Sequence, residues 1–271
     1  MGREDAYPEE APAKQVKVSD FWIDKTEVTN AQFASFVKAT GYVTQAEKGL
    51  DAERFPDIAQ EFRSPGSMVF TPPDSLQGAS PFVWWRFVPG ADWRHPFGPD
   101  STIAGKEDYP VVQVTHDDAA AYAAWAGRRL PSEAEWEFAA ASGKEDEGAK
   151  STAPPAEANT WQGVFPVLNT AGDGFEGLAP AGCFAADKKG VFDLVGNVWE
   201  LTSSAYYPRH DAAETGEGFD PRTPGVPVYV IKGGSYLCAE NYCVRYRPEA
   251  RQPMDAFLGS SHIGFRTVRN N

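Results

Sequence analysis

Glycine and proline limit the fold of this chain more than any other sequence feature. Its 271 residues include 25 glycines and 22 prolines, and eight of the prolines fall between Ala46 and Tyr109. Proline interrupts helices and the interior of sheets, so no long regular element can cross this stretch. The same stretch is rich in aromatic residues, which bury a large area even on irregular backbone. We therefore expect a packed, ordered loop here that lines a functional site.

Short helices are predicted at three capping residues. Each is followed three positions later by Gln, Asp or Glu, the spacing of a capping box; the capping residues are Thr29, Thr115 and Ser132. The first helix is expected to end at Gly41, because glycine readily takes the left-handed conformation that closes a helix. The last helix is expected to pack Trp136 and Phe138 into the core.

The remaining segments are predicted to be loops and short strands. Strands are expected between Val16 and Ile23 and from Val111 to Val114. The polar residues 1–12 are expected to form a frayed end, and the charged, Pro- and Ala-rich stretch 144–158 a mobile surface loop. The sequence thus predicts the α+β class: an irregular single domain over residues 1–271, rich in loops, with short strands and a few short helices.

The charge balance excludes two classes of function. Lys and Arg number 25 against 38 Asp and Glu, which gives a net charge of −13. Nucleic acids and anionic membranes are bound by basic surfaces, so neither is an expected partner. No apolar run approaches the length of a membrane span.

The cysteines offer the first candidate chemistry. Cys238 and Cys243 lie five positions apart, and a straight strand would separate their sulfurs by about 17 Å. They can meet only if the intervening residues turn, which Asn241 permits. A meeting would produce a disulfide, a site for a soft metal such as Cu(I), or two inert thiols. Cys183 is expected to be a small buried apolar residue.

Other polar residues have both a functional and a structural interpretation. Oxygen-rich turns are candidate Ca²⁺ sites, and they include Asn159, Asp173 and the run from Asp193 to Glu200. The same residue types also occur in turns because of their backbone preferences. The residues alone favour this structural interpretation. His95 is either a general base or a hydrogen-bonded structural residue. Three arginines after the cysteine pair bind a carboxylate or peptide carbonyls, or pair with the chain's own acids: Arg245, Arg247 and Arg251.

Taken together, the motifs resemble the formylglycine-generating enzyme (sulfatase-modifying factor) family. The matching segments run along nearly the whole chain in family order: 21–24, 27–30, 39–42, 93–96, 126–137, 159–163, 196–200, 233–235 and 264–266. The fold-level motifs mark a superfamily with several functions, so fold alone does not determine activity. The cysteine pair, three residues after Ser235, is the feature of members that oxidise a substrate cysteine.

The resemblance implies a copper-dependent oxidase. It implies that Cys238 and Cys243 bind Cu(I) and that O₂ converts a cysteine in a Cys-x-Pro-x-Arg segment of an unfolded sulfatase to Cα-formylglycine. Further catalytic residues implied by position are Ser235, Trp199 and Tyr246. The arginines and the Trp-Arg-His motif are expected to bind substrate through Arg245, Arg247, Trp93 and His95.

The same resemblance implies one or two Ca²⁺ ions. One would be bound by Asn159 and Asp173 side chains with backbone oxygens of Thr160 and Phe175. The second set comprises Asp193, Glu200, the Gly196 and Val198 carbonyls, and Glu27 as a further ligand.

Two other functions remain open at this point. One is a non-catalytic ligand- or peptide-binding module of the same lectin-like fold, and the other is a related iron-dependent sulfoxide synthase. For the oxidase we expect a monomer in the bacterial cytoplasm, since the chain shows no signal segment and a reducing compartment would keep the thiols available for copper.

Overall fold

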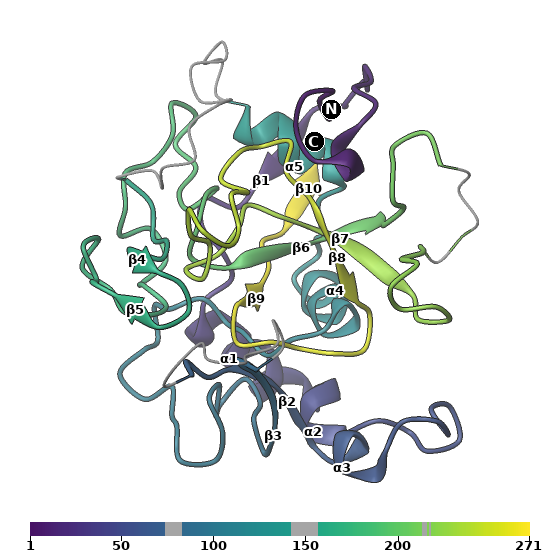
Figure 1. The fold of residues 1–271 in the computed structure, drawn as a ribbon, viewed down its shortest axis with the longest axis vertical. Coiled ribbons are helices and arrows are strands. Elements are labelled where there is room, and N and C mark those ends of the chain that lie inside the picture. Colours follow the sequence, from purple (N-terminus) through teal and green to yellow (C-terminus); the bar gives the residue numbers. More distant parts are fainter. Residues whose placement is uncertain (74–82, 142–156, 213–215, 217) are drawn as a thin grey trace.

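The computed structural model describes residues 1–73, 83–141, 157–212, 216 and 218–271. It confirms the predicted α+β architecture, with small sheets, short helices and long connecting loops (Figure 1). The stretch 144–158, predicted to be a mobile loop, lies outside the described residues except for its last two positions. No helix in the described parts of the chain is both long and apolar enough to span a membrane.

A four-stranded sheet forms the centre of the molecule. Its strand order is β8 (Gln252–Asp255), β7 (Val228–Lys232), β6 (Trp199–Ala205) and β9 (Ile263–Gly264). Strand β6 pairs antiparallel with β7 and parallel with β9. The other strands form two-stranded antiparallel pairs: β1 (Phe21–Ile23) with β10 (Val268–Asn270), β2 (Gly66–Phe70) with β3 (Trp85–Pro89), and β4 (Gly163–Val164) with β5 (Leu168–Asn169).

The helices begin where the capping boxes predict. α1 (Asn30–Thr40), α4 (His116–Trp125) and α5 (Glu133–Ala140) each carry the reciprocal cap hydrogen bonds. α1 ends at Gly41, which has a φ of 67°. Shorter helical turns are α2 (Gln45–Lys48), α3 (Gln60–Arg63) and η1 (Pro8–Glu10). α4 and α5 pack against the central sheet (Figure 1).

Two aromatic clusters make up most of the core. The larger one joins α1 and α4 to the central sheet through Phe33, Tyr122 and Phe265, whose rings contact one another. The second joins Phe70 of β2 and Trp84 to Phe165. It also includes the residues on either side of Cys238, so part of the Pro-rich stretch packs against the segment that carries this cysteine.

Three local predictions are wrong. Val111 to Val114 is not a strand, because Gln113 takes a left-handed backbone (φ 62°) and its side chain donates to the Pro96 carbonyl. Phe138 is 59% exposed, since the outer face of α5 turns it away from the core that holds Trp136. Cys183 is exposed because it lies in a surface turn.

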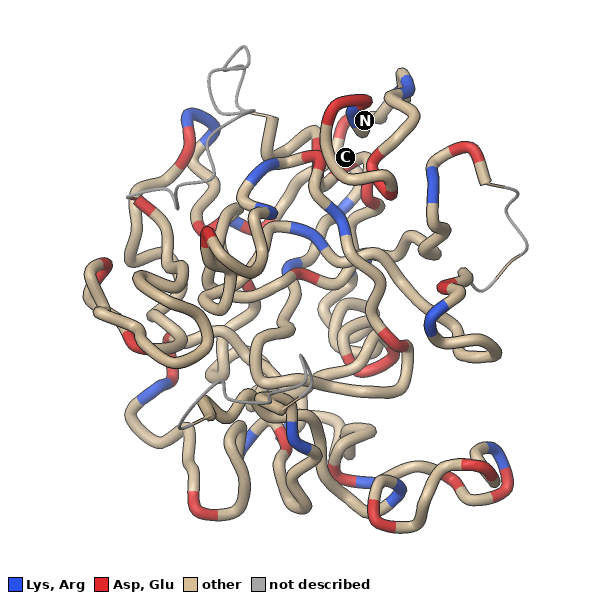
Figure 2. The backbone as a smooth tube through the Cα atoms, viewed as in Figure 1, with Lys and Arg blue, Asp and Glu red and all other residues tan. Residues whose placement is uncertain are grey.

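The N-terminal segment is not frayed. Glu10 is fully buried and forms an ion pair with Arg247, and Glu9 pairs with Arg245 at 2.7 Å. Figure 2 shows the acidic positions along this N-terminal loop. The surplus of acids therefore has a structural use here: it attaches the start of the chain to the segment that follows the cysteines.

Candidate active site: a buried cysteine pair

A tight turn brings the two cysteines together. The Cys238 N–H donates to the Ser235 carbonyl, and the N–H groups of Tyr242 and Cys243 both donate to the Ala239 carbonyl. Asn241 contributes through its side chain, which accepts from the Phe165 N–H and donates to the Phe165 carbonyl. The turn that the spacing required is thus present, and Asn241 stabilises it by bonding to a distant loop.

The sulfurs of Cys238 and Cys243 are in contact and are not joined by a disulfide. Both side chains are buried. Burial, followed by the hydrogen bond to Cys243, raises the pKa of Cys238. The hydrogen bond from Cys238 lowers the pKa of Cys243 against the effect of burial, and the positive charge of Arg245 lowers it further.

Two of the predicted catalytic residues, Trp199 and Tyr246, pack in the same apolar cluster as the two cysteines. Trp93, predicted to bind substrate, belongs to this cluster as well. Trp199 is the first residue of β6, and its N–H donates to the His262 carbonyl. Ser235 is fully buried, and its hydroxyl accepts from the Leu237 N–H at 3.3 Å. The Tyr246 hydroxyl is buried without a hydrogen-bond partner among the described residues.

The residues predicted to bind substrate behave differently. Arg245 and Arg247 form ion pairs with Glu9 and Glu10. His95 shares a hydrogen bond of 2.6 Å between its Nδ1 and the Ser101 carbonyl, inside its own turn. Contact with a substrate stays a prediction for all three.

The first predicted calcium set comes together around Asp173. One carboxylate oxygen of Asp173 accepts from the Thr160 N–H at 3.1 Å, and the other accepts from the Phe175 N–H at 3.0 Å. Asn159 lies in the same region and donates to the Gly177 carbonyl. These four residues therefore form one oxygen-rich loop cluster.

In the second predicted set, Glu200 has a different partner from Glu27 and Asp193. Both Glu200 oxygens contact Arg266 at 2.6 Å, so this carboxylate is already neutralised. Glu27 and Asp193 instead face each other, and one Glu27 oxygen is buried with no hydrogen-bond partner in the part of the chain that the structure describes. Burial first, and then the Asp193 charge, raise the pKa of Glu27 well above its usual range. A divalent cation would relieve this repulsion between carboxylates.

Comparison with known proteins identifies the family. The pattern of the sulfatase-modifying factor enzyme 1-like domain matches residues 1–271. The chain belongs to this family. A formylglycine-generating enzyme of Mycobacterium tuberculosis is 47% identical over 99% of this chain and 93% of its own length. An inactive Cα-formylglycine-generating enzyme 2 of Mus musculus is 37% identical over 95% of this chain and 77% of its own length.

A solved structure supports the fold alone. PvdO from Pseudomonas aeruginosa aligns with a TM-score of 0.64 and 22% identity, over 100% of this chain and 90% of PvdO. One family member is named inactive, so membership in the family does not by itself establish the activity of a given chain. That activity depends on the residues of its site.

The donor groups fit the metals that the family resemblance implies. Two adjacent buried sulfurs are the soft ligands that Cu(I) prefers. In the described residues, no three His, Cys, Asp or Glu side chains group into a metal site. Calcium would therefore need backbone oxygens, such as those predicted for Thr160, Phe175, Gly196 and Val198, beside the carboxylates.

Sequence reasoning missed the N-terminal contribution to the site. Tyr7 lies against the Arg245 guanidinium, with 3.8 Å between the guanidinium carbon and the ring centroid, and Glu9 binds the same group. The only signal in the sequence was an acidic segment and a basic one more than 200 residues apart. Such a signal does not say which acid meets which base.

Proposed function

We propose that this chain is a copper-dependent oxidase that converts cysteine to Cα-formylglycine in a Cys-x-Pro-x-Arg segment of an unfolded sulfatase. The observation that carries the proposal is the contact of two buried, unbridged thiols inside an aromatic cluster. The family relatives named formylglycine-generating enzyme support the reaction class. Because one relative is named inactive, the activity of this chain needs a direct test.

The overall reaction balances with a two-electron donor. The substrate R–CH₂–SH, O₂, two electrons and two protons give R–CHO, H₂S and H₂O, and a thiol reductant of the cell would supply the electrons. When bound by Cys238 and Cys243, Cu(I) would supply the activation of O₂. The protein's own part is to bind and shield the reacting groups.

The residues around the sulfurs suit that part. Trp93 and Trp199 belong to the apolar cluster that contains the sulfurs, and such surroundings exclude water and strengthen polar interactions inside. The Tyr246 hydroxyl is buried, has no hydrogen-bond partner among the described residues, and is suited to hold a substrate carbonyl. Ser235 fixes the turn that presents Cys238.

We also propose that calcium stabilises the loops of residues 159–200. The carboxylates of Asp173, Glu27 and Asp193, with Asn159, would bind the ions together with nearby backbone oxygens. The partners proposed are the sulfatase segment and O₂, with the chain acting as a monomer in the bacterial cytoplasm.

The test is turnover of a peptide containing Leu-Cys-Thr-Pro-Ser-Arg by Cu(I)-loaded protein in the presence of O₂ and a thiol. Mass spectrometry should show replacement of the cysteine CH₂–SH by CHO. Cys238→Ser and Cys243→Ser should abolish this product, whereas Cys183→Ser, at the exposed third cysteine, should retain it.

Two outcomes would replace the proposal with its alternatives. Turnover supported by Fe(II) and not by Cu(I) would favour an iron enzyme of the sulfoxide-synthase type. Absence of both metal binding and turnover would favour a binding module of the same fold.

A further inference from the structure

Arg245 lies between the cysteine pair and the N-terminal segment. One end nitrogen of its guanidinium donates to Glu9 at 2.7 Å, and the guanidinium plane lies over the Tyr7 ring. The side chain lies two positions after Cys243, and its positive charge contributes to lowering the pKa of that thiol. On the backbone side, a Cβ built on Gly234 would lie 3.2 Å from the Arg245 carbonyl and 3.3 Å from the Cys238 sulfur. Arg245 is thus adjacent to both halves of the pair.

The other two arginines of this segment have different partners. Arg247 pairs with the fully buried Glu10. Arg251 pairs with Glu133 at 2.8 Å and donates to the carbonyls of Glu9 and Tyr207. The Nε–H of Arg245 is buried and has no hydrogen-bond partner among the described residues. The Nε of Arg251 also has no hydrogen bond there, but it lies 2.8 Å from a Glu133 oxygen, whereas no acid is paired with the Nε of Arg245. It is a donor that still needs an acceptor.

A charge argument identifies that acceptor. Two thiolates and one Cu(I) carry a net charge of −1, and a buried charge is costly unless an opposite charge or a hydrogen-bond donor meets it. The Arg245 guanidinium, held by Glu9 and Tyr7 on the residue two positions after Cys243, would supply both. Groups that contact metal ligands in this way change metal affinity by about 10- to 100-fold.

We propose that Arg245, held by Glu9 and Tyr7, is a positioning residue that stabilises the anionic bis-thiolate complex of Cu(I) and thereby sets its affinity. This inference rests on the proposed copper function. It assigns Arg245 to the metal complex in place of the substrate contact expected from the sequence, and it gives the N-terminal segment a role in the site.

The experiment measures the dissociation constant of Cu(I) under anaerobic conditions, by competition with a chromogenic Cu(I) chelator. Arg245→Met should weaken binding about 10- to 100-fold. Arg245→Lys, which keeps the charge, should recover most of the affinity. Arg245→Gln removes the charge while retaining a polar contact for Glu9. It replaces Arg245→Met in the affinity measurement if the methionine variant does not fold.

Two double variants provide a matched comparison. Arg245→Met with Glu9→Gln, and Arg247→Met with Glu10→Gln, each remove one ion pair between the same two segments and leave the net charge unchanged. Only the first should weaken Cu(I) binding, while circular dichroism should show both folded.

The outcomes separate the two hypotheses. Equal Cu(I) affinity of wild type and of folded Arg245→Met or Arg245→Gln would overturn the role of Arg245 and leave the copper function standing. A wild-type protein that binds no Cu(I) would overturn both. Equal weakening by the two double variants would show that the segment contact, and not the Arg245 charge, determines affinity, which also overturns the inference.

Discussion

Gly234 shows how a single backbone position shapes the cysteine site. Its φ of 77° lies in the left-handed region, and it lets the chain pass close to the Cys238 sulfur and the Arg245 carbonyl. A side chain would be strained by the backbone and would also press on both neighbours. Gly41 has a similar φ of 67° with nothing within 4 Å of its hypothetical Cβ, which separates the two effects.

Gly234→Ala is predicted to lose about 1–2 kcal/mol of unfolding free energy from backbone strain and, in addition, to weaken Cu(I) binding. Gly41→Ala should lose a similar free energy with unchanged Cu(I) affinity. Denaturant unfolding and chelator competition measure the two quantities. Equal Cu(I) affinities for the two variants would contradict the steric role given to Gly234.

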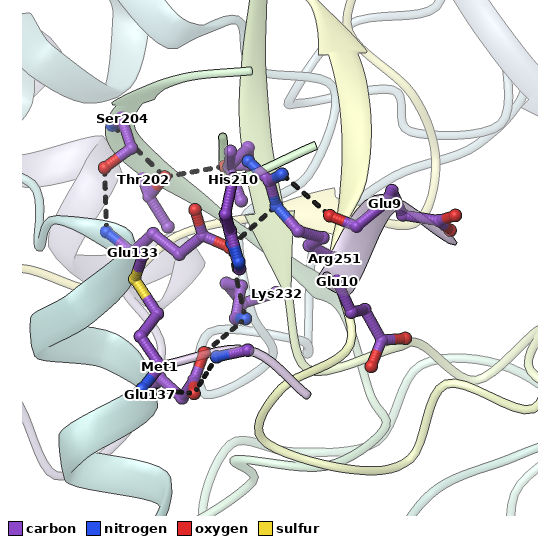
Figure 3. A network of polar contacts seen from close by, with 12 residues as sticks. Met1, Glu9, Glu10, Glu133, Glu137, Thr202, Ser204, His210, Lys232 and Arg251 are labelled. Carbon is purple, nitrogen blue, oxygen red and sulfur yellow. Dashed lines mark hydrogen bonds and ion pairs between the residues drawn. The ribbon is translucent and has the colours of Figure 1, made fainter. Parts of the chain in front are cut away.

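Helix α5 is attached to the central sheet by buried charges. Glu133, in its first turn, faces Lys232 of β7, Arg251 and His210, and Glu137 one turn later also pairs with Lys232 (Figure 3). Burial by itself raises the pKa of Glu133, but Lys232, His210 and Arg251 overcome it and lower the pKa to about 2. These partners come from three separate parts of the chain.

This network predicts a pH dependence of stability. Because the folded pKa of Glu133 lies below its usual value of 4.5, its contribution is complete above that value and is lost as the pH falls toward about 2. The loss is on the order of 3 kcal/mol. Urea unfolding between pH 5 and pH 2 should show it. Glu133→Gln should be less stable at pH 5 and have a flatter profile, whereas the exposed Glu61→Gln should match wild type; a Glu133→Gln profile as steep as wild type would refute this.

At the scale of the whole molecule, the loops of residues 159–200 connect distant regions. The Asn197 side chain donates to Glu27 and accepts from the Ala179 N–H. Glu27 lies three positions before the first residue of α1, and residue 200 lies within β6. An ion bound among the carboxylates here would connect the N-terminal half to the central sheet.

Removal of calcium is therefore predicted to lower the melting temperature. At a Ca²⁺ concentration about 100-fold above its dissociation constant, binding contributes about 3 kcal/mol, or about 5 °C in a domain of this size. Differential scanning calorimetry with Ca²⁺ or with a chelator tests this. Asp173→Asn and Asp193→Asn should each reduce the difference, and exposed Asp100→Asn should not. Identical melting temperatures with Ca²⁺ and with chelator would argue against calcium.

The sequence by itself determined the features that depend on near neighbours. The helix starts at Thr29, Thr115 and Ser132 follow from residues three positions apart, because a capping box is closed within one turn. The spacing of Cys238 and Cys243 showed that they could meet only across a turn, and this turn is present. The family motifs pointed to Trp93, Trp199 and Tyr246; these residues share the apolar cluster of the cysteines, and their roles stay predictions.

Only the tertiary structure decided the long-range pairings. Glu9 meets Arg245 across 236 positions, and Glu200 meets Arg266 rather than standing free for a metal. An excess of acids offers many partners for each arginine, and only the folded backbone selects among them. Long-range contacts also explain why residues 111–114 do not form the predicted strand. The backbone conformation of Gln113 is set by hydrogen bonds to Ser260 and Pro96, which are distant in sequence.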